Sequence, residues 1–180
     1  MTVNCPFECE YLQEARRHDR PAELDPKDVP NQDIRITDEF VQEHEGLLTV
    51  TGGALLSAAL DTPGSVDYDV REALDALVRT LRTLQSGVYY ETIPANPLAA
   101  NLYRVVQNAT AQFRQQEQQQ LGVSRTRDAD VLGVLVFLQR VELDRNNGRP
   151  RGRAFLDSLR AFYSAQPEPP EPSRSSLILP

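Results

Sequence analysis

A row of six apolar residues restricts the fold of this chain more than any other feature of its sequence. The six are Val70, Leu74, Leu77, Leu81, Leu84 and Val88. They follow one another at steps of 4, 3, 4, 3 and 4 residues, the period of about 3.5 residues that marks a helix packed along one side against other helices. We therefore expect a helix that ends near Tyr89-Tyr90. Its apolar side is expected to face either its own bundle or a second copy of the chain.

Four further segments carry helical patterns, at about residues 37–61, 97–121, 128–145 and 151–164. Thr37 and the pair Asn96-Pro97 are typical helix starts, and Gly122 is a typical stop. Gly52-Gly53 interrupts the first of these patterns. Such a pair indicates either a kink or the close approach of a neighbouring helix.

The segment from Val131 to Leu138 is apolar almost without interruption, which is typical of a helix surrounded by other helices. Its β-branched residues also fit a buried strand, but the polar continuation through Gln139-Arg140 favours a helix. Eight residues are far fewer than the roughly 20 that cross a bilayer, so no membrane association is expected. The last helix is expected to bury Phe155, Leu156, Leu159 and Phe162.

These patterns predict one all-α domain, a helical bundle of about five main helices with a segment of different composition at each end. Residues 1–36 are predicted to form an acidic N-terminal arm with one short helix. The rest of the arm is expected to be extended, because the segment contains four prolines, which disfavour helix. Residues 37–166 form the bundle. Residues 167–180, rich in proline and glutamate, are read as a disordered tail with an apolar end.

The charge of the chain is concentrated at its N-terminal end. The net charge is -7, and residues 1–45 already hold twelve acidic against five basic residues, so the remainder is balanced. A duplex-binding protein needs a concentrated positive face, and the totals show none. Two cysteines and the lack of a secretory signal indicate a reducing, cytoplasmic location.

Four side chains make up all the thiols and imidazoles of the chain: Cys5, Cys9, His18 and His44. Four is the number of ligands in a structural zinc site, so zinc is one candidate cofactor. Cys5 and Cys9 lie one helical turn apart near a helix start, where a thiolate is also reactive. The remaining interpretation is that both cysteines are small buried residues, and that His44 packs within an apolar stripe.

Arginines gather around the turn before the last helix. The candidate anion-binding or RNA-binding residues are Arg145, Arg149, Arg151 and Arg153. Guanidinium groups beside the free N–H groups of a helix start can bind phosphate. Alternatively, these arginines pair with the acidic arm.

The printed sequence closes with four residues that the bundle does not need: Leu177, Ile178, Leu179 and Pro180. A linker followed by a short apolar stretch is the layout of a docking peptide. The stretch binds either a partner protein or an apolar patch of its own bundle.

Catalytic motifs are missing from the sequence. Ala15 and Val41 stand where a di-iron carboxylate bundle has glutamate three residues before histidine, and no phosphate-binding glycine loop or serine elbow is present. We therefore rank a non-catalytic interaction or regulatory protein first. A metal- or thiol-dependent protein comes second, and an RNA- or anion-binding module third.

Overall fold

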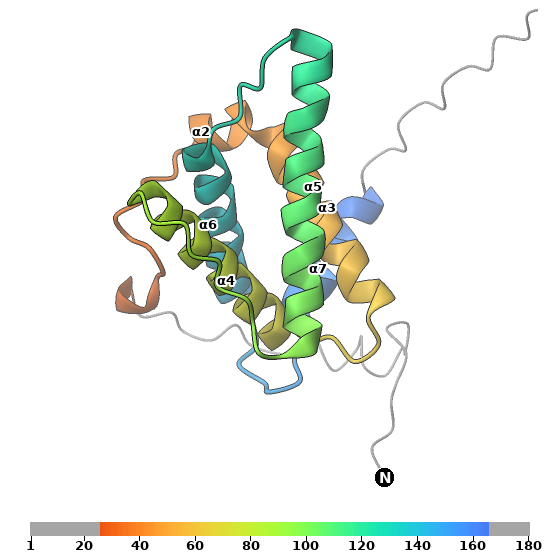
Figure 1. Ribbon diagram of the computed structural model, residues 1–180. Coiled ribbons are helices and arrows are strands. Elements are labelled where there is room, and N and C mark those ends of the chain that lie inside the picture. The colour runs from red at the N-terminus through yellow and green to blue at the C-terminus, as the bar shows by residue number, and fades with distance from the viewer. Residues whose placement is uncertain (1–25, 166–180) are drawn as a thin grey trace, which may run out of the picture.

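The computed structural model describes residues 26–165, and within them the chain folds into helices without a strand (Figure 1). Its elements are the 3-10 turn η1 (Pro26–Asp28) and the helices α2 (Asp38–Glu43), α3 (Glu45–Asp61), α4 (Asp67–Gln85), α5 (Pro97–Leu121), α6 (Asp128–Arg145) and α7 (Ala154–Ala165). The predicted all-α fold is confirmed. Val131–Leu138 lies in the helix α6, as favoured, and the alternative of a buried strand is wrong. None of the described helices is both long enough and apolar enough to cross a membrane.

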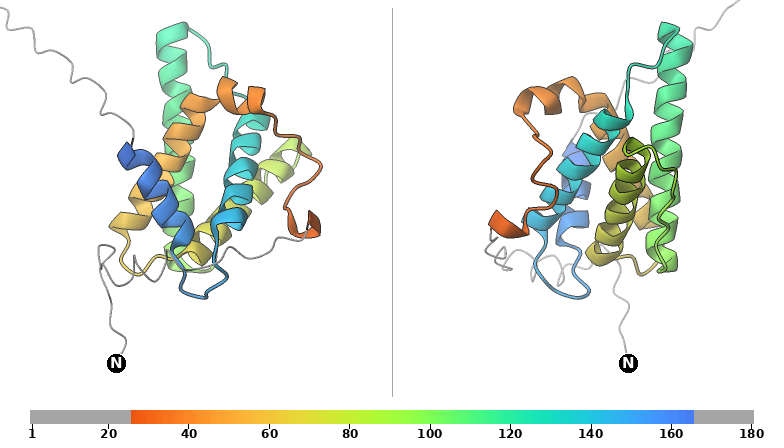
Figure 2. Two further views of the ribbon diagram at one scale, coloured as in Figure 1. Left: turned by 180° about the vertical axis from the view of Figure 1, so that it is seen from behind. Right: turned by 60° about the vertical axis from the view of Figure 1, so that its left-hand side comes forward.

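The helices pack in pairs around one core. α4 contacts both α5 and α6, α3 contacts α5, and α7 rests on α3 and α6. The two views in Figure 2 show α7 and α3 on the side of the molecule behind α5 as it appears in Figure 1. α6 lies among these helices and is buried on nearly every side, as its apolar sequence predicts.

Local capping explains where several helices start and stop. The Thr37 hydroxyl accepts a hydrogen bond from the Phe40 amide (3.2 Å), and the Asn96 side chain accepts one from the Leu98 amide (3.0 Å). Gly122 ends α5 in the left-handed conformation at φ 77°. The glutamine-rich end of α5 extends past the other helices, as its lack of apolar residues indicates (Figure 1).

α4 is shorter than its apolar row predicts. Val70, Leu74 and Leu77 are buried in the core, but Leu84 is exposed and the helix ends at Gln85. Gly87 then takes φ 82° and the chain turns away, which leaves Val88 outside the helix. The prediction that the helix continues to Tyr89-Tyr90 is therefore wrong, because a period in the sequence does not show where the neighbouring helices end.

The first predicted helix is broken in two at His44, eight residues before the glycine pair. His44 has φ -106° and ψ 19°, between α2 and α3. Its ring stacks on the Phe40 ring at 4.3 Å between centroids. The Phe40 ring packs on Gly133 of α6, where its Cε atoms would lie 3.1 Å from a Cβ. The break therefore lets α2 close over the start of α6.

Gly52-Gly53 marks a close approach, the second of the two predicted alternatives. The Tyr163 ring of α7 lies against both glycines, and a Cβ on Gly52 would meet its hydroxyl at 2.6 Å. The same hydroxyl donates a hydrogen bond to the Thr49 carbonyl oxygen (2.8 Å). The two glycines thus let α7 pack closely against α3. The helix α3 continues through them without a break.

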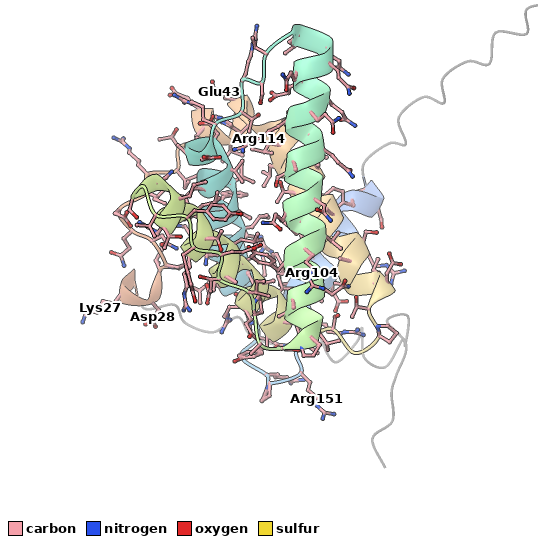
Figure 3. All side chains as sticks on the ribbon, viewed as in Figure 1. Lys27, Asp28, Glu43, Arg104, Arg114 and Arg151 are labelled. Carbon is pink, nitrogen blue, oxygen red and sulfur yellow. The ribbon has the colours of Figure 1, made fainter. Side chains whose placement is uncertain are left out.

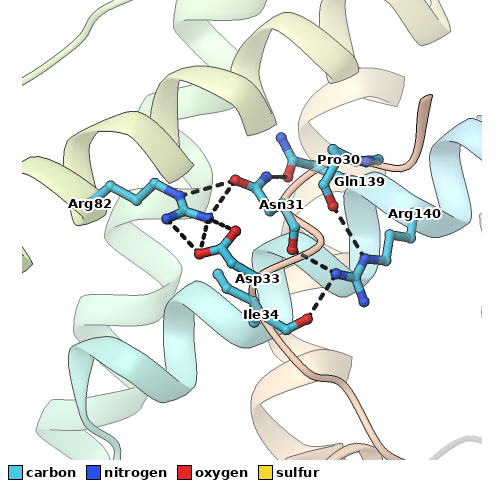
Figure 4. Close-up of polar contacts among 7 residues, drawn as sticks. All are labelled: Pro30, Asn31, Asp33, Ile34, Arg82, Gln139 and Arg140. Atoms are coloured by element: carbon cyan, nitrogen blue, oxygen red, sulfur yellow. Dashed lines mark hydrogen bonds and ion pairs between the residues drawn. The ribbon is translucent and has the colours of Figure 1, made fainter. Parts of the chain in front are cut away.

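The described part of the arm is bound by arginines of the bundle (Figure 4). The Arg82 guanidinium donates to the side chains of Asn31 and Asp33 at 2.8–3.0 Å. Arg140 donates to the carbonyl oxygens of Pro30, Asn31 and Ile34 at 2.7–3.3 Å. These contacts join the arm to α4 and α6.

We expect Gly133→Ala to lower the free energy of unfolding by about 1–3 kcal/mol, because the new methyl group must displace the Phe40 ring. In a Phe40→Ala background the same substitution meets no ring, and its better helix propensity makes it neutral or stabilising by up to about 1 kcal/mol. Urea unfolding of the four proteins in this cycle measures the coupling. Additive effects would contradict the packing of Phe40 on Gly133.

Candidate functional site

An apolar groove of about 550 Å³ opens between α2, α3, α6 and α7. Its apolar lining comes from Val41, Leu48, Phe137, Val141, Leu159 and Phe162. Pockets that bind ligands in proteins have volumes of about 300–1,000 Å³ and are mostly apolar, and this groove meets both criteria. The sequence shows these residues only as parts of four separate helical patterns.

Phe162 is the most exposed aromatic residue of the groove. Its side chain was predicted to be buried, but 56% of its surface is exposed, so that prediction is wrong. It makes an edge-to-face contact with the Tyr163 ring, whose hydroxyl is fixed to α3. α7 thus packs the Tyr163 ring against the core and presents the Phe162 ring to solvent at the groove.

The charged side chains of the groove lie at its rim and are few. Glu45 and Arg145 are exposed there, and Arg145 pairs with the neighbouring carboxylate of Asp144 at 3.2 Å. Gln42 adds an exposed amide. An uncharged, apolar ligand therefore fits the groove better than a strongly charged one.

The position of α7, and with it one wall of the groove, depends on a buried carboxylate. Asp67, at the start of α4, accepts hydrogen bonds from the amides of Phe155 (3.1 Å) and Leu156 (3.2 Å) in the first turn of α7. Only 1% of Asp67 is exposed. Burial raises the pKa of this carboxyl to about 6, although the two amide hydrogen bonds oppose the rise. The negative charge of Glu142 raises it further.

Glu142 of α6 lies at the centre of a second buried polar network, close enough to Asp67 for the two charges to interact. It is 2% exposed and pairs with Arg71 of α4 through Oε2 (2.9 Å) and Oε1 (3.1 Å). The Asn146 amide donates to Glu142 Oε1 (2.7 Å), and the Asn146 oxygen accepts from the Gly148 amide (2.6 Å). This carboxylate therefore fixes both α4 and the loop that leads to α7.

We expect the unfolding free energy to fall between about pH 4 and pH 7 by about 2 kcal/mol through Asp67 alone. Its pKa is higher in the folded state than the ordinary aspartate value of 3.8, so the folded protein binds this proton more tightly. The stabilisation is complete below the unfolded pKa and is lost as the pH rises through about 6. Asp67→Asn removes this dependence, so the unfolding free energy of the original chain minus that of the variant should fall by about 2 kcal/mol over the same pH range. A difference that is constant with pH would contradict the raised pKa.

Of the four predicted metal ligands, only His44 lies within the described residues. Its Nδ1 lies 2.9 Å from the Phe40 carbonyl oxygen, and its Nε2 lies 3.6 Å from Asp130. Residues 26–165 contain no group of three or more histidine, cysteine or acidic side chains that could hold a metal. Cys5, Cys9 and His18 lie outside this range, so the zinc site stays a prediction.

The predicted anion-binding arginines have different surroundings in the structure. Arg153 donates to the Ser65 carbonyl oxygen (2.8 Å), Arg145 pairs with Asp144, and Arg151 extends from the loop away from the helices (Figure 3). The α7 amides proposed to bind an anion already donate to Asp67. An anion at this position would have to compete with that carboxylate. Arg149 lies in the same loop.

A second hollow, of about 340 Å³, lies beside α4 and the Thr92–Ala95 segment, and its lining is mixed in character. Its Arg71 is engaged by Glu142, and its Asp75 accepts from the Gln139 amide at 2.6 Å. Two of its charged side chains are therefore already paired within the bundle. Leu177, Ile178, Leu179 and Pro180, the predicted docking residues, lie outside the described residues.

No protein-family model matches the chain, and neither does a curated protein or a solved structure.

Proposed function

We propose that this chain is a non-catalytic interaction protein that receives a short apolar protein segment in the groove between α2, α3, α6 and α7. The observation that carries the proposal is an open apolar groove of about 550 Å³ with Phe162 exposed at its edge. Water against such a surface is unfavourable, at about 25 cal/mol for each Å² of apolar area. A ligand that replaces this water gains affinity from burial alone.

The lining indicates the chemistry of the segment. Leucine, valine and phenylalanine side chains on the groove walls favour leucine or isoleucine side chains on the ligand. Among the polar lining side chains, Gln42, Glu45 and Arg145 are exposed. The Ser158 hydroxyl already donates to the Phe155 carbonyl oxygen (2.7 Å) and the Tyr163 hydroxyl to that of Thr49 (2.8 Å). Backbone N–H and C=O groups of a ligand therefore find few partners inside the groove. An amphipathic helix meets this requirement because it satisfies its own backbone, and a short apolar stretch meets it when its backbone stays in water at the open side of the groove.

A synthetic amphipathic peptide tests the proposal. The peptide carries leucine at helical spacing on a lysine–glutamate background and a fluorescent label. The protein is the full chain with Leu177→Ser, Ile178→Ser and Leu179→Ser, so that its own apolar stretch does not compete. We expect saturable binding by fluorescence anisotropy, because the leucine face covers the groove.

Matched charge substitutions locate the binding site. Phe162→Glu should weaken peptide binding about tenfold or more, because the ligand must then cover a carboxylate. Tyr89→Glu is the control, since Tyr89 is also an exposed aromatic (79%) but lies outside the groove. Binding that is absent, or that both substitutions weaken equally, would overturn the proposal.

A further inference from the structure

The described residues form an apolar groove, and the sequence contains an apolar stretch that could bind in it. α7 supplies three residues of the groove wall, Leu159, Phe162 and Tyr163. The same helix ends at Ala165, two residues after Tyr163. The chain therefore leaves the described structure at the groove itself.

We propose that Leu177, Ile178 and Leu179 bind in the groove of their own chain, so that the docking site is closed until a partner segment displaces them. This inference rests on the function proposed above, because it assigns a regulation to the same groove. The three side chains are uncharged and branched, the kind of ligand that the apolar lining favours.

The length of the intervening chain permits this contact. Leu177 follows Ala165 by twelve residues, which in extended form reach about 40 Å. α7, which runs along the groove, is only about 18 Å long. The segment can therefore turn back and lie anywhere along the groove.

Attachment to the same chain makes even a weak contact effective. A connection of about twelve residues supplies an effective concentration of about 1 mM. An apolar stretch with a Kd of about 0.1 mM would then fill the groove for about nine-tenths of the time and weaken a competing peptide about tenfold. A second copy of the chain reaches such a concentration only in very concentrated solution, so binding within one chain is favoured.

One introduced tryptophan can report on the contact without interference, because the original chain contains no tryptophan. In the full chain carrying Leu179→Trp, we expect blue-shifted emission and a quenching constant for acrylamide that is several-fold below that of free tryptophan. Adding Phe162→Glu should shift the emission to the red and restore quenching. Adding Tyr89→Glu, the control outside the groove, should change neither. The shift should also be independent of protein concentration.

Three results would overturn the inference. The first is emission typical of water in the Leu179→Trp chain, and the second is a blue shift that Phe162→Glu leaves unchanged. The third is a blue shift that disappears on dilution, which would place the stretch in the groove of a second copy.

The peptide titration separates failure of this inference from failure of the proposed function. If the original chain and the triple serine variant bind the amphipathic peptide equally tightly, the groove is functional but not closed by its own chain. If the serine variant binds no peptide, the proposed function itself fails. We expect the serine variant to bind about tenfold more tightly than the original chain.

Discussion

Leu135→Ala is expected to lower the free energy of unfolding by about 2–5 kcal/mol. Leu135 lies in the middle of α6 with 1% of its surface exposed, and α6 contacts α3, α4 and α7. The substitution removes buried apolar surface and leaves a cavity among helices that cannot all move to fill it. Urea unfolding followed by circular dichroism measures the change.

Leu121→Ala is the matched control for this substitution. Leu121 is also a helical leucine, at the end of α5, but it is 53% exposed. Its replacement should change the unfolding free energy by no more than about 0.5 kcal/mol. Comparable losses at both positions would mean that α6 is not the central helix of the bundle.

Glu142→Ala is the second substitution expected to have a large effect, a loss of about 2–4 kcal/mol. It removes the acceptor for Arg71 and for the buried Asn146 amide. Arg71 is 41% exposed and can turn partly to water, so the loss stays below that of a fully buried ion pair. Denaturant unfolding at neutral pH gives the value.

Two further variants separate charge from shape at this network. Glu142→Gln keeps the size and one acceptor oxygen, so we expect a smaller loss of about 1–2 kcal/mol. Asp144→Ala removes an exposed carboxylate two residues away, whose pair with Arg145 lies at the surface, and should cost less than about 1 kcal/mol. An effect of Glu142→Ala as small as that of Asp144→Ala would rule out a structural role for the buried pair.

Much of the helical fold can be predicted from the sequence, because the residues that start, stop and pattern a helix lie close together in the chain. The bounds of α5 and α6 agree with their predicted ranges, since capping residues and apolar periodicity act within a few residues. The errors arise where tertiary contacts decide. The first helix is broken at His44, and just before the break Phe40 packs on Gly133, more than ninety residues further along the chain.

The groove could not be predicted in the same way. Val41, Leu48, Val141 and Phe162 belong to four helices, and only the fold brings them together. Phe162 stands one turn after the buried Leu159, so its spacing indicates a core residue. The buried carboxylates Asp67 and Glu142 carry no sequence signal that separates them from exposed acids such as Asp144.

The most direct test of the groove as a docking site is a map of amide chemical shifts in the triple serine variant as the amphipathic peptide is added. We expect the largest changes around Leu48, Val141 and Phe162, with the amides of α5 nearly unchanged. Changes gathered instead around the exposed Val88 and Tyr89, with the groove amides unmoved, would show that the peptide binds elsewhere and would contradict the proposed function.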